Sequence, residues 1–443
     1  MEVLLEYILS GIIVLAMIIL VLYIYLKNYR AESKINSLKI DKAKEMGFHE
    51  PISLHPVVNQ DICIGSGACV SACPEKDILG LVSGKGKLIN ASQCVGHGAC
   101  FHACPVEAIT LVMGTEKRGV ELPHVSQNYE TNIGGIYIAG ELGGMGLIRN
   151  AVEQGRIAME NIIHSLPASS KSDYDVIIVG AGPAGVSASL TASKHNKKFL
   201  TLEQDSLGGT VFTFPRSKVV MTSPMDLPLH GKINLKETNK STLLSLWKEV
   251  LEKNNISINE NEKVQEIIKH DDFFEVLTNR KKYTCSKVLL SIGRRGSPRK
   301  LRVPGEEKEK VAYRLLDPEL IINKKILVVG GGDSAIESAL LLAEKGDNQV
   351  TISYRSKSFR RLKPANLAKI EKAENSNKMN IIYESEIESI GEKEVIIKLK
   401  NSRVVPIQND LVYIFAGGEL PNKFLEKIGI KITRKFGEAV LKH

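Results

Sequence analysis

The sequence predicts an α/β protein in which two three-layer domains are joined to a small α+β domain and to one transmembrane helix near the amino terminus. Three observations carry this prediction: two strand–glycine-turn–helix motifs, a repeated cysteine pattern, and one long uncharged apolar run. Of the 443 residues, 43% are hydrophobic and 25% are charged. This is the composition of an ordinary globular protein, and the length allows roughly two to four domains.

The basic excess of the chain points to a membrane and not to nucleic acid. Lys and Arg number 59 against 50 Asp and Glu, a net charge of +9. No dense basic tract interleaved with aromatic residues occurs, so we expect no nucleic acid partner. Part of the excess follows directly after the apolar run near the amino terminus.

That apolar run predicts a membrane-spanning helix. Ile8 to Leu26 contains 19 consecutive residues without a charge. A helix of about 20 residues crosses the hydrocarbon core of a bilayer. Tyrosines lie near both ends of the run, where aromatic belts form: Tyr7, Tyr23 and Tyr25. A cleaved signal peptide is the alternative, but it would have a positive start, a shorter apolar core and a small-residue cleavage site.

Charges on either side of the run predict its orientation. Glu2 and Glu6 precede it. The basic residues that follow it are Lys27, Arg30, Lys34 and Lys39. Because basic flanks stay on the cytoplasmic side, we expect a single-pass protein of the cell membrane with its catalytic part in the cytoplasm. Residues 1–30 would form the helix with its positive flank, and residues 31–56 a juxtamembrane linker. Within residues 27–60 we expect a charged juxtamembrane helix and then a Pro-containing linker.

Six of the seven cysteines belong to an internal repeat. The pattern C-x5-C-x3-C-P occurs twice, at an offset of 31 residues. Its cysteines are Cys63, Cys69 and Cys73, then Cys94, Cys100 and Cys104. Glycines inside the loops also repeat, Gly65 with Gly96 and Gly67 with Gly98. Such clustering favours metal ligation over scattered disulfides, and the spacing differs from that of the usual zinc pairs.

This repeat resembles the two-cluster bacterial ferredoxins, whose pattern is C-x2-C-x2-C-x3-C-P. The resemblance covers about residues 57–114. In that family the cysteine before proline ligates the other cluster. The implied ligand sets are Cys63, Cys69 and Cys104 for one cluster, and Cys94, Cys100 and Cys73 for the other.

The second cysteine of the ferredoxin pattern is replaced in both motifs. Ser66 stands in its place in the first motif and His97 in the second. Three thiolates suit a 3Fe–4S cluster, or a 4Fe–4S cluster whose remaining iron is bound by Ser66, His97 or solvent. A module without clusters is the third alternative. We expect a cluster at both sites, because six cysteines and both prolines of the pattern remain.

Residues 175–185, DVIIVGAGPAG, predict a strand, a glycine turn and the start of a helix. Gly180 makes the tight turn, Gly182 lets the backbone approach a pyrophosphate, and Gly185 allows close packing of the helix. A second strand ends at Glu203, where an acid binds ribose hydroxyls. Strand, turn, helix and acid together predict a Rossmann-like dinucleotide site.

Residues 326–335, ILVVGGGDSA, repeat this arrangement with Gly330, Gly332 and Ala335 in the motif positions. No acid stands where Glu203 stands in the first motif. Arg355 follows the second strand instead, with Arg360 nearby. Arginines bind a 2′-phosphate that an acid would repel. We therefore expect NADP at this site, with NAD as the alternative.

Two such sites in one chain resemble the flavoprotein reductases of the thioredoxin-reductase type, in the pyridine nucleotide-disulphide oxidoreductase family. The resemblance covers about residues 173–443. It implies an FAD-binding domain at residues 173–300, an NADP-binding domain at residues 301–424, and a return segment at residues 425–443. It also implies that Gly208 and Gly209 form a loop of the FAD site.

One segment of that family occurs here in another place. The family ends with a strand, a glycine, an acid and a helix, and a similar segment, Thr131 to Glu141, lies upstream of the first glycine motif. The resemblance implies that Gly140 and Glu141 bind FAD. Residues 115–165 would complete the FAD domain as a circular permutation, which surface termini tolerate. The alternative is an appendage of the ferredoxin-like domain.

The paired cysteines of disulfide reductases are missing, since neither C-x2-C nor C-x4-C occurs. Cys285 is expected to be a buried structural thiol, and no side chain is assigned as a catalytic acid or base. We expect NAD(P)H, FAD and two iron–sulfur clusters to exchange electrons with a redox partner protein or a quinone. The alternatives are a reductase of small disulfides and a redox-sensing subunit. A homodimer is one expected oligomeric state.

Overall fold

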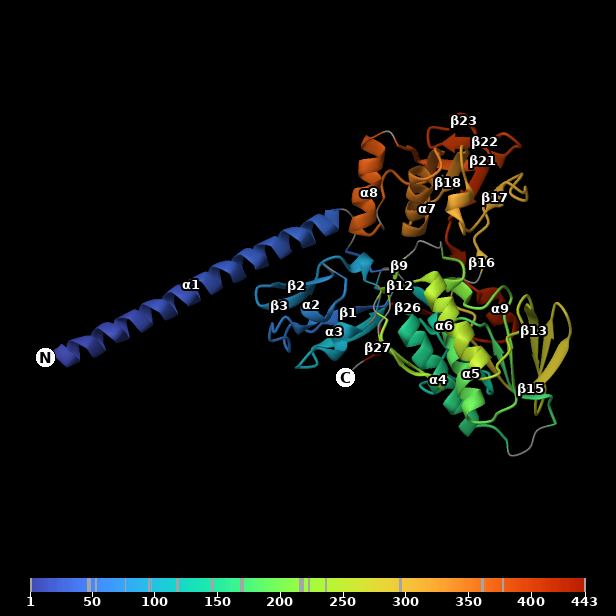
Figure 1. Ribbon diagram of the computed structural model, residues 1–443, viewed down its shortest axis with the longest axis horizontal. Coiled ribbons are helices and arrows are strands. Elements are labelled where there is room, and N and C mark those ends of the chain that lie inside the picture. The colour runs from blue at the N-terminus through green and yellow to red at the C-terminus, as the bar shows by residue number, and fades with distance from the viewer. Residues whose placement is uncertain are drawn as a thin grey trace. The chain divides into compact units, whose positions relative to one another are not determined.

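The structure, a computed structural model, describes residues 2–441 apart from short gaps. The gaps are residues 46–48, 52–53, 76, 95, 97, 117–118, 145–146, 168–170, 215–218, 222–223, 236, 295–296, 360–361 and 377. The expected site residues His97 and Arg360 therefore lie outside the described residues. The chain forms two compact units, Met1–Val120 with Phe436–His443, and Glu121–Lys435 (Figure 1).

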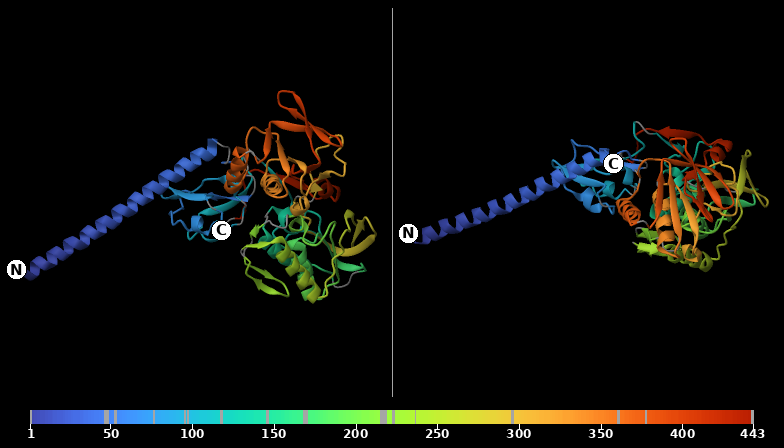
Figure 2. Two further views of the ribbon diagram at one scale, coloured as in Figure 1. Left: turned by 45° about the horizontal axis from the view of Figure 1, so that its top comes forward. Right: turned by 90° about the horizontal axis from the view of Figure 1, so that it is seen from above.

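A single helix, α1 (Glu2–Glu45), begins the first unit. Length and apolar composition make Gly11–Glu45 a candidate membrane span. The helix continues through most of the stretch expected as a linker, residues 31–56, and strand β1 begins within that stretch at Leu54. Both views in Figure 2 show α1 as one uninterrupted helix that extends beyond the small domain on which it packs.

The carboxyl-terminal half of α1 packs on a hairpin of that small domain. The hairpin consists of β2 (Leu79–Val82) and β3 (Lys85–Leu88). Buried Asn36 donates from Nδ2 to the carbonyl oxygen of Leu81 at 3.0 Å. The Ser33 hydroxyl oxygen accepts from the backbone N–H of Ser83 at 2.9 Å. Residues three apart share one helix face, so this face of α1 is fixed to the domain.

The small domain is built on an antiparallel sheet in the order β1–β4–β27. Its elements are β1 (Leu54–Val58), α2 (Ala68–Ala72), the 3₁₀ turn η1 (Ala91–Gln93), α3 (Ala99–His102), β4 (Ile109–Met113) and β27 (Glu438–Leu441). Leu54, Ile109, Leu111 and Met113 are almost fully buried in its core. The last described strand of the chain thus completes the sheet that begins at Leu54.

The first glycine motif lies in a sheet of the second unit. Its strands are β13 (Val264–Lys269), β14 (Phe274–Thr278), β15 (Lys282–Leu290), β7 (Tyr174–Val179) and β8 (Phe199–Leu202), in that spatial order. Strand β6 (Ile136–Ile138) pairs in parallel with Val288–Leu290 of β15. A strand from residues 115–165 therefore belongs to the same sheet as the glycine motif. Cys285 is fully buried in β15.

Two helices of this domain pack backbone to backbone. They are α4 (Ile148–His164) and α5 (Pro183–Lys194). A Cβ at Gly155 of α4 would lie 2.1 Å from the carbonyl oxygen of Ala184 in α5. Small buried side chains extend this contact, among them Ala151, Ala158 and Ala188. Because α5 begins at the glycine motif, α4 lies directly beside the expected FAD loop.

The second glycine motif lies in a parallel sheet that separates two cores. The strands, in spatial order, are β17 (Val311–Ala312), β24 (Leu411–Ile414), β18 (Lys325–Val329), β19 (Gln349–Tyr354) and β20 (Asn380–Tyr383). Val328 packs with Ile336 of α7 (Asp333–Glu344), whereas its neighbour Leu327 packs on the other face with Val395. Val395 belongs to an antiparallel sheet of β21 (Ser385–Ile390), β22 (Glu394–Leu399) and β23 (Val404–Gln408). The α/β Rossmann-type fold predicted from the two motifs is confirmed.

Beyond this domain the chain returns first to the core beside the first glycine motif. The elements are α9 (Asn422–Lys427) and β26 (Ile432–Lys435), which pairs with β5 (Val120–Pro123). Leu425 of α9 is buried in one core with Ile177 of β7. From Phe436 onward the chain belongs to the first unit. The segment expected as a return segment, residues 425–443, therefore divides between the two units.

Further elements complete the second unit. They are η2 (Glu141–Gly143), η3 (Gly209–Val211), β9 (Val219–Met221), β10 (Met225–Leu227), β11 (Gly231–Ile233), β12 (Glu237–Asn239), α6 (Lys240–Lys253), β16 (Ser297–Pro298), η4 (Pro318–Leu320), α8 (Pro364–Asn375) and β25 (Gly418–Glu419).

Substitution of Gly155 tests the contact between α4 and α5. We expect Gly155→Ala to lower the free energy of unfolding by about 1–3 kcal/mol, because the added methyl group forces two backbones apart. Trp247, the only tryptophan, is fully buried in a cluster with Val152 of α4. Its fluorescence during urea unfolding therefore reports on this domain.

The matched control is Gly134→Ala, since a Cβ at Gly134 has no neighbour closer than 3.9 Å. Equal urea midpoints for the two variants would contradict the close packing at Gly155.

Candidate functional site

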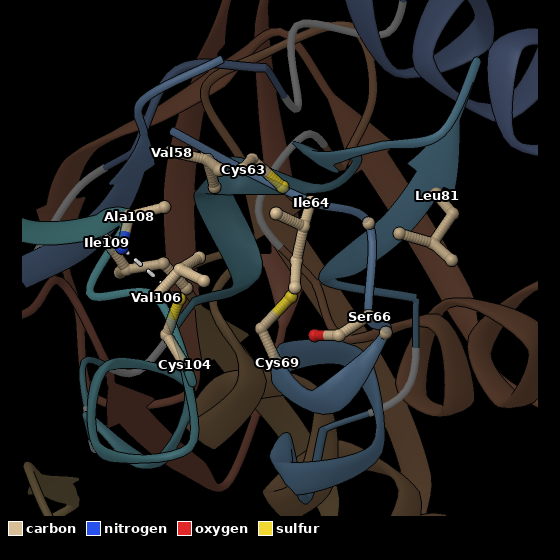
Figure 3. A pocket seen from close by; sticks show the side chains of 12 residues that line it. Val58, Cys63, Ile64, Ser66, Cys69, Leu81, Cys104, Val106, Ala108 and Ile109 are labelled. Atoms are coloured by element: carbon tan, nitrogen blue, oxygen red, sulfur yellow. Dashed lines mark hydrogen bonds between the residues drawn. The ribbon is translucent and has the colours of Figure 1, made fainter. Parts of the chain in front are cut away.

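The first expected cluster site is a hollow of about 310 Å³, counting the space open to solvent. Cys63, Cys69 and Cys104 line it, together with Ser66. Cys63 is 9% and Cys69 is 8% exposed. Figure 3 shows their side chains around one space. The structure thus brings Cys104 of the second motif to two cysteines of the first, in the grouping that the ferredoxin resemblance implies.

Left-handed glycines shape both cysteine loops in the same way. Gly65, Gly67 and Gly96 have φ of 73°, and Gly98 has φ of 74°. Glycine adopts this region without the steric cost of a Cβ. A Cβ at Gly65 would lie 2.1 Å from the carbonyl oxygen of Gly84. The loops therefore require glycine at these positions for conformation and, at Gly65, for space.

Backbone N–H groups donate to sulfur in the first hollow. Gly86 donates to Cys63 Sγ at 3.3 Å, and Ala108 donates to Cys104 Sγ at 3.2 Å. Such bonds stabilise thiolate charge and contribute to the reduction potential of a bound cluster. Burial raises the pKa of the Cys69 thiol, and repulsion from Cys63 and Cys104 raises that pKa further.

Cys73, Cys94 and Cys100 form the second group. Burial raises the pKa of Cys94 to about 11 and that of Cys100 to about 12. Repulsion from Cys73 adds to both pKa shifts, and repulsion from Cys69 of the first motif adds to that of Cys100 as well. Thiols in such surroundings ionise beside bound metal, whose positive charge deprotonates a coordinating thiol.

The chemistry of these donors fits iron–sulfur clusters, which thiolates ligate. Among the described residues, no group of three His, Cys, Asp or Glu side chains is arranged to hold one metal ion. Buried thiols, N–H donors to sulfur and left-handed glycine loops together suit iron–sulfur clusters.

Ser66 occupies the position of the missing cysteine in the first motif. It lines the hollow, and its hydroxyl oxygen accepts from the backbone N–H of Ala68 at 3.4 Å. Figure 3 shows the Ser66 side chain beside Cys69. Its equivalent in the second motif, His97, lies outside the described residues.

The first nucleotide loop divides its glycines between tight and open positions. Gly180 has φ of 104°, and a Cβ there would lie 2.6 Å from the carbonyl oxygen of Ser291. A Cβ at Gly185 would lie 1.9 Å from the carbonyl oxygen of Gly180. At Gly182, which precedes α5, a Cβ would meet nothing within 4 Å. The open space is where the motif requires a pyrophosphate to approach the backbone.

Glu203 supports this loop from the end of β8. It is 5% exposed, and its carboxylate accepts from the N–H groups of Ala181 at 2.7 Å and Asp205 at 3.0 Å. Burial raises the pKa of Glu203, and these two hydrogen bonds oppose the rise. A carboxylate has about four acceptor positions, so Glu203 can still accept hydrogen bonds from a ribose, as the motif predicts.

The other expected FAD residues lie around the same loop. Gly208 donates its N–H to the carbonyl oxygen of Ala181 at 2.9 Å. A Cβ at Gly209 would lie 3.4 Å from Cα of Gly182.

The upstream segment reaches this loop as well. A Cβ at Gly140 would lie 3.2 Å from the Ala184 side chain, and Glu141, which follows, begins η2. The Gly140 N–H donates to Gln154 Oε1 at 2.9 Å. Sequence reasoning did not single out Gln154.

The second nucleotide loop repeats the division into tight and open positions. A Cβ at Gly330 would lie 2.5 Å from the carbonyl oxygen of Phe415. Gly332 has nothing within 4 Å of a Cβ, and Ala335 is fully buried in α7. Arg355 is exposed directly after β19, at the carboxyl end of that strand.

Tyr354 is a further residue at this loop that the motif did not indicate. A Cβ at Gly331 would lie 2.2 Å from the Tyr354 ring. The ring also stacks on Phe359 with centroids 5.0 Å apart. The ring of Tyr354, the residue before Arg355, therefore covers part of the second glycine loop.

Comparison with known families divides the chain in a similar way. Residues 177–442 match the family described as pyridine nucleotide-disulphide oxidoreductase. Residues 55–105 match the 4Fe-4S dicluster domain.

Two curated relatives and one solved structure show the extent of the likeness. Bacilliredoxin reductase Bdr of Bacillus subtilis is 27% identical over 266 residues, 59% of this chain and 82% of the relative. Ferredoxin–NADP reductase of Ignicoccus hospitalis is 31% identical over 187 residues, 42% of this chain, which spans only 58% of that relative. Bacillithiol disulfide reductase Bdr of Staphylococcus aureus aligns with a TM-score of 0.52 and 24% identity over 59% of this chain and 81% of that structure, a likeness of fold.

Alanine substitutions test the grouping of cysteines across the two motifs. We expect Cys63→Ala and Cys104→Ala to remove one iron–sulfur EPR signal, and Cys73→Ala and Cys94→Ala to remove the other. Each variant would lose roughly half of the bound iron, because each pair serves one of two clusters. Cys285→Ala is the control and would keep both signals. Loss of the same signal in Cys63→Ala and Cys73→Ala would contradict the grouping.

Valine at the open glycines tests the two nucleotide loops separately. Neither Gly182 nor Gly332 has a left-handed φ or a neighbour within 4 Å of a Cβ, so valine should leave the fold intact. We expect Gly182→Val to lose bound FAD, seen as flavin absorbance, and Gly332→Val to raise the Kd of NADPH by at least about tenfold, because the side chain blocks the pyrophosphate. Each variant serves as the control for the other. Loss of both ligands in either variant would contradict separate sites.

Proposed function

Because the chain belongs to the pyridine nucleotide-disulphide oxidoreductase family, we propose that it is a membrane-anchored enzyme that moves electrons between NAD(P)H, FAD and iron–sulfur clusters. The two family matches make the chain a flavin-dependent pyridine nucleotide oxidoreductase with a 4Fe-4S domain. Our proposal adds to this a membrane anchor, a preference for NADP over NAD, and an electron path to or from a redox partner protein or a quinone.

The observation that carries the proposal is the presence, in one chain, of two nucleotide loops and a repeated ferredoxin-type cysteine motif whose Cys63, Cys69 and Cys104 line one hollow. A flavin accepts a pair of electrons as hydride and can release them singly, and iron–sulfur clusters carry single electrons. The absence of a C-x2-C or C-x4-C pair leaves the six ferredoxin-type cysteines as the redox-active thiols of the chain. Cys285 stays buried in a strand, where burial raises its pKa to about 12.

Backbone groups would bind both nucleotides. Gly182 and the amino terminus of α5 would hold the FAD pyrophosphate, because free N–H groups and the helix dipole attract phosphate. Gly332 and α7 would hold the nicotinamide nucleotide in the same way. Arg355 would pair with a 2′-phosphate, which favours NADP over NAD.

The position of β6 supports the circular permutation. Strand β6 lies beside β15 in the sheet of the first glycine motif, and α4 packs on α5. Residues 115–165 would thus complete the FAD domain and place Gly140 and Glu141 at the flavin. The ferredoxin-like domain would then precede the FAD domain without an intervening nicotinamide domain.

The anchor rests on the apolar run of α1. The run is long enough to span a bilayer, and the basic residues after it favour a cytoplasmic catalytic part. The homodimer expected from the sequence stays a prediction.

A reductase of small disulfides is the second candidate. The relative named bacilliredoxin reductase favours it. Turnover of small disulfides that is unaffected by loss of the clusters would support this candidate.

Reduction by NADPH without oxygen tests the proposed electron path. We expect the flavin absorbance to bleach and the iron–sulfur EPR signal to change together, because electrons pass between the two groups. The Gly332→Val variant is the control and should show neither change at the same NADPH concentration. Bleached flavin in a protein without bound iron would leave a flavin reductase and remove the clusters from the proposal.

A further inference from the structure

The contacts of α1 determine which end of the small domain lies nearest to the apolar run. Moving toward the carboxyl end of the helix, the contacts move from the hairpin tip toward its base. In order, they join Ser33 to Ser83, Asn36 to Leu81, and Lys39 to Asp77. The tip of the hairpin therefore points toward the apolar run, as Figure 1 also shows for β2 and β3 beside α1.

Tyr29 gives the depth of that tip. A Cβ at Gly84, in the hairpin turn, would lie 2.7 Å from the Tyr29 hydroxyl oxygen. Tyr29 follows Leu26, the last residue of the uncharged run, by about 4.5 Å along the axis at about 1.5 Å per residue. The headgroup region is about 5–8 Å thick on each side of the hydrocarbon. Tyr25 stacks on Tyr29 with centroids 6.3 Å apart, and tyrosines are enriched at this depth.

The same hairpin turn contacts the loop of the first cluster site. A Cβ at Gly65 would lie 2.1 Å from the carbonyl oxygen of Gly84. Ile62 and Ile64 flank Cys63 in this loop and are 48% and 65% exposed. Single exposed isoleucines need no explanation, but these two lie beside the end of the domain that is nearest to the apolar run.

The charges near this end favour a lipid surface. Lys27, Arg30 and Lys34 are exposed on α1 just beyond the apolar run. Each basic residue near an anionic bilayer contributes about 1 kcal/mol of attraction. Asp61 is the single charged residue of residues 59–67. The loop itself therefore adds little electrostatic repulsion from an anionic bilayer.

We propose that the small domain rests on the membrane surface, with Ile62 and Ile64 inserted among lipid headgroups beside the anchor. This depends on the proposed function, because it requires α1 to span a bilayer. Cys63, Cys69 and Cys104 then lie at the membrane face of the domain. The redox partner of this site is therefore one that resides in the membrane.

Tryptophans introduced by substitution measure the depth of this surface. The variants are Ile62→Trp, Ile64→Trp, Met17→Trp and Leu38→Trp, in the full chain reconstituted in nanodiscs of phosphatidylcholine and phosphatidylglycerol. The native chain supplies the blank, because its one tryptophan, Trp247, is fully buried. Lipids brominated near the headgroup or near the chain end quench tryptophan at the corresponding depth. Bound iron, measured on each sample, shows that the loop variants keep their clusters.

Met17 and Leu38 are the matched controls. Met17 lies inside the uncharged run, so quenching of Met17→Trp by the deep bromine reports the anchor itself. Leu38 is 61% exposed and lies about 18 Å beyond Leu26 along the helix, at about 1.5 Å per residue. We expect Leu38→Trp to keep its emission with either lipid.

We expect Ile62→Trp and Ile64→Trp to show blue-shifted emission that is lost mainly to the shallow bromine. Quenching of Met17→Trp with neither loop variant quenched would overturn the proposal and leave the anchor standing. A blue shift without quenching would mean that protein covers the loop, which also overturns it. If Met17→Trp is not quenched, the anchor fails and this proposal fails with it, whereas NADPH-dependent bleaching tests the electron path independently.

Discussion

The domain that contains the first glycine loop depends on close packing between α4 and α5, which requires a glycine at position 155. At Gly155 the backbone of α4 meets the carbonyl oxygen of Ala184 in α5, and α5 starts at the first glycine loop. The neighbouring residue Gln154 accepts from the Gly140 N–H, so the same helix also holds the segment that precedes it. A larger residue at position 155 would displace the loop and the strand β6 together. The order of segments along the chain matters less than this contact.

Backbone geometry shapes both nucleotide loops and both cysteine loops. In each nucleotide loop the first glycine has no room for a Cβ, at Gly180 and Gly330, whereas the middle one faces open space. In each cysteine loop two glycines adopt the left-handed region. These requirements recur at fixed spacing, which explains why repeats in the sequence revealed the sites. The side chains that differ between copies, Glu203 and Arg355 above all, would then distinguish one nucleotide from the other.

Sequence patterns predicted the local motifs, but they did not predict several contacts between residues that are far apart in the sequence. Both strand–turn–helix motifs and the cysteine repeat are determined within about 30 residues, and the structure forms them where they were expected. A charged helix after the apolar run was expected, and α1 continues to Glu45. Its packing on a hairpin was not expected, because the bond from buried Asn36 to Leu81 joins residues 45 apart in the sequence. Tyr354 reaches Gly331 only through the pairing of β18 with β19. The pairing of β27 with β4 was likewise not predictable, because the four residues of β27 have mixed polarity and no pattern that indicates a partner.

Strand β27 also imposes an order on biosynthesis. Domains generally fold as units while the chain leaves the ribosome, the amino-terminal ones first. Here the amino-terminal sheet has β1 and β4 early, but its third strand, Glu438–Leu441, follows more than 300 residues after Met113, the last residue of β4. Until then the free edge of β4 stays open to unwanted pairing. A chain interrupted during translation would keep that edge beside its cysteines, and cellular proteases could recognise it as unfinished.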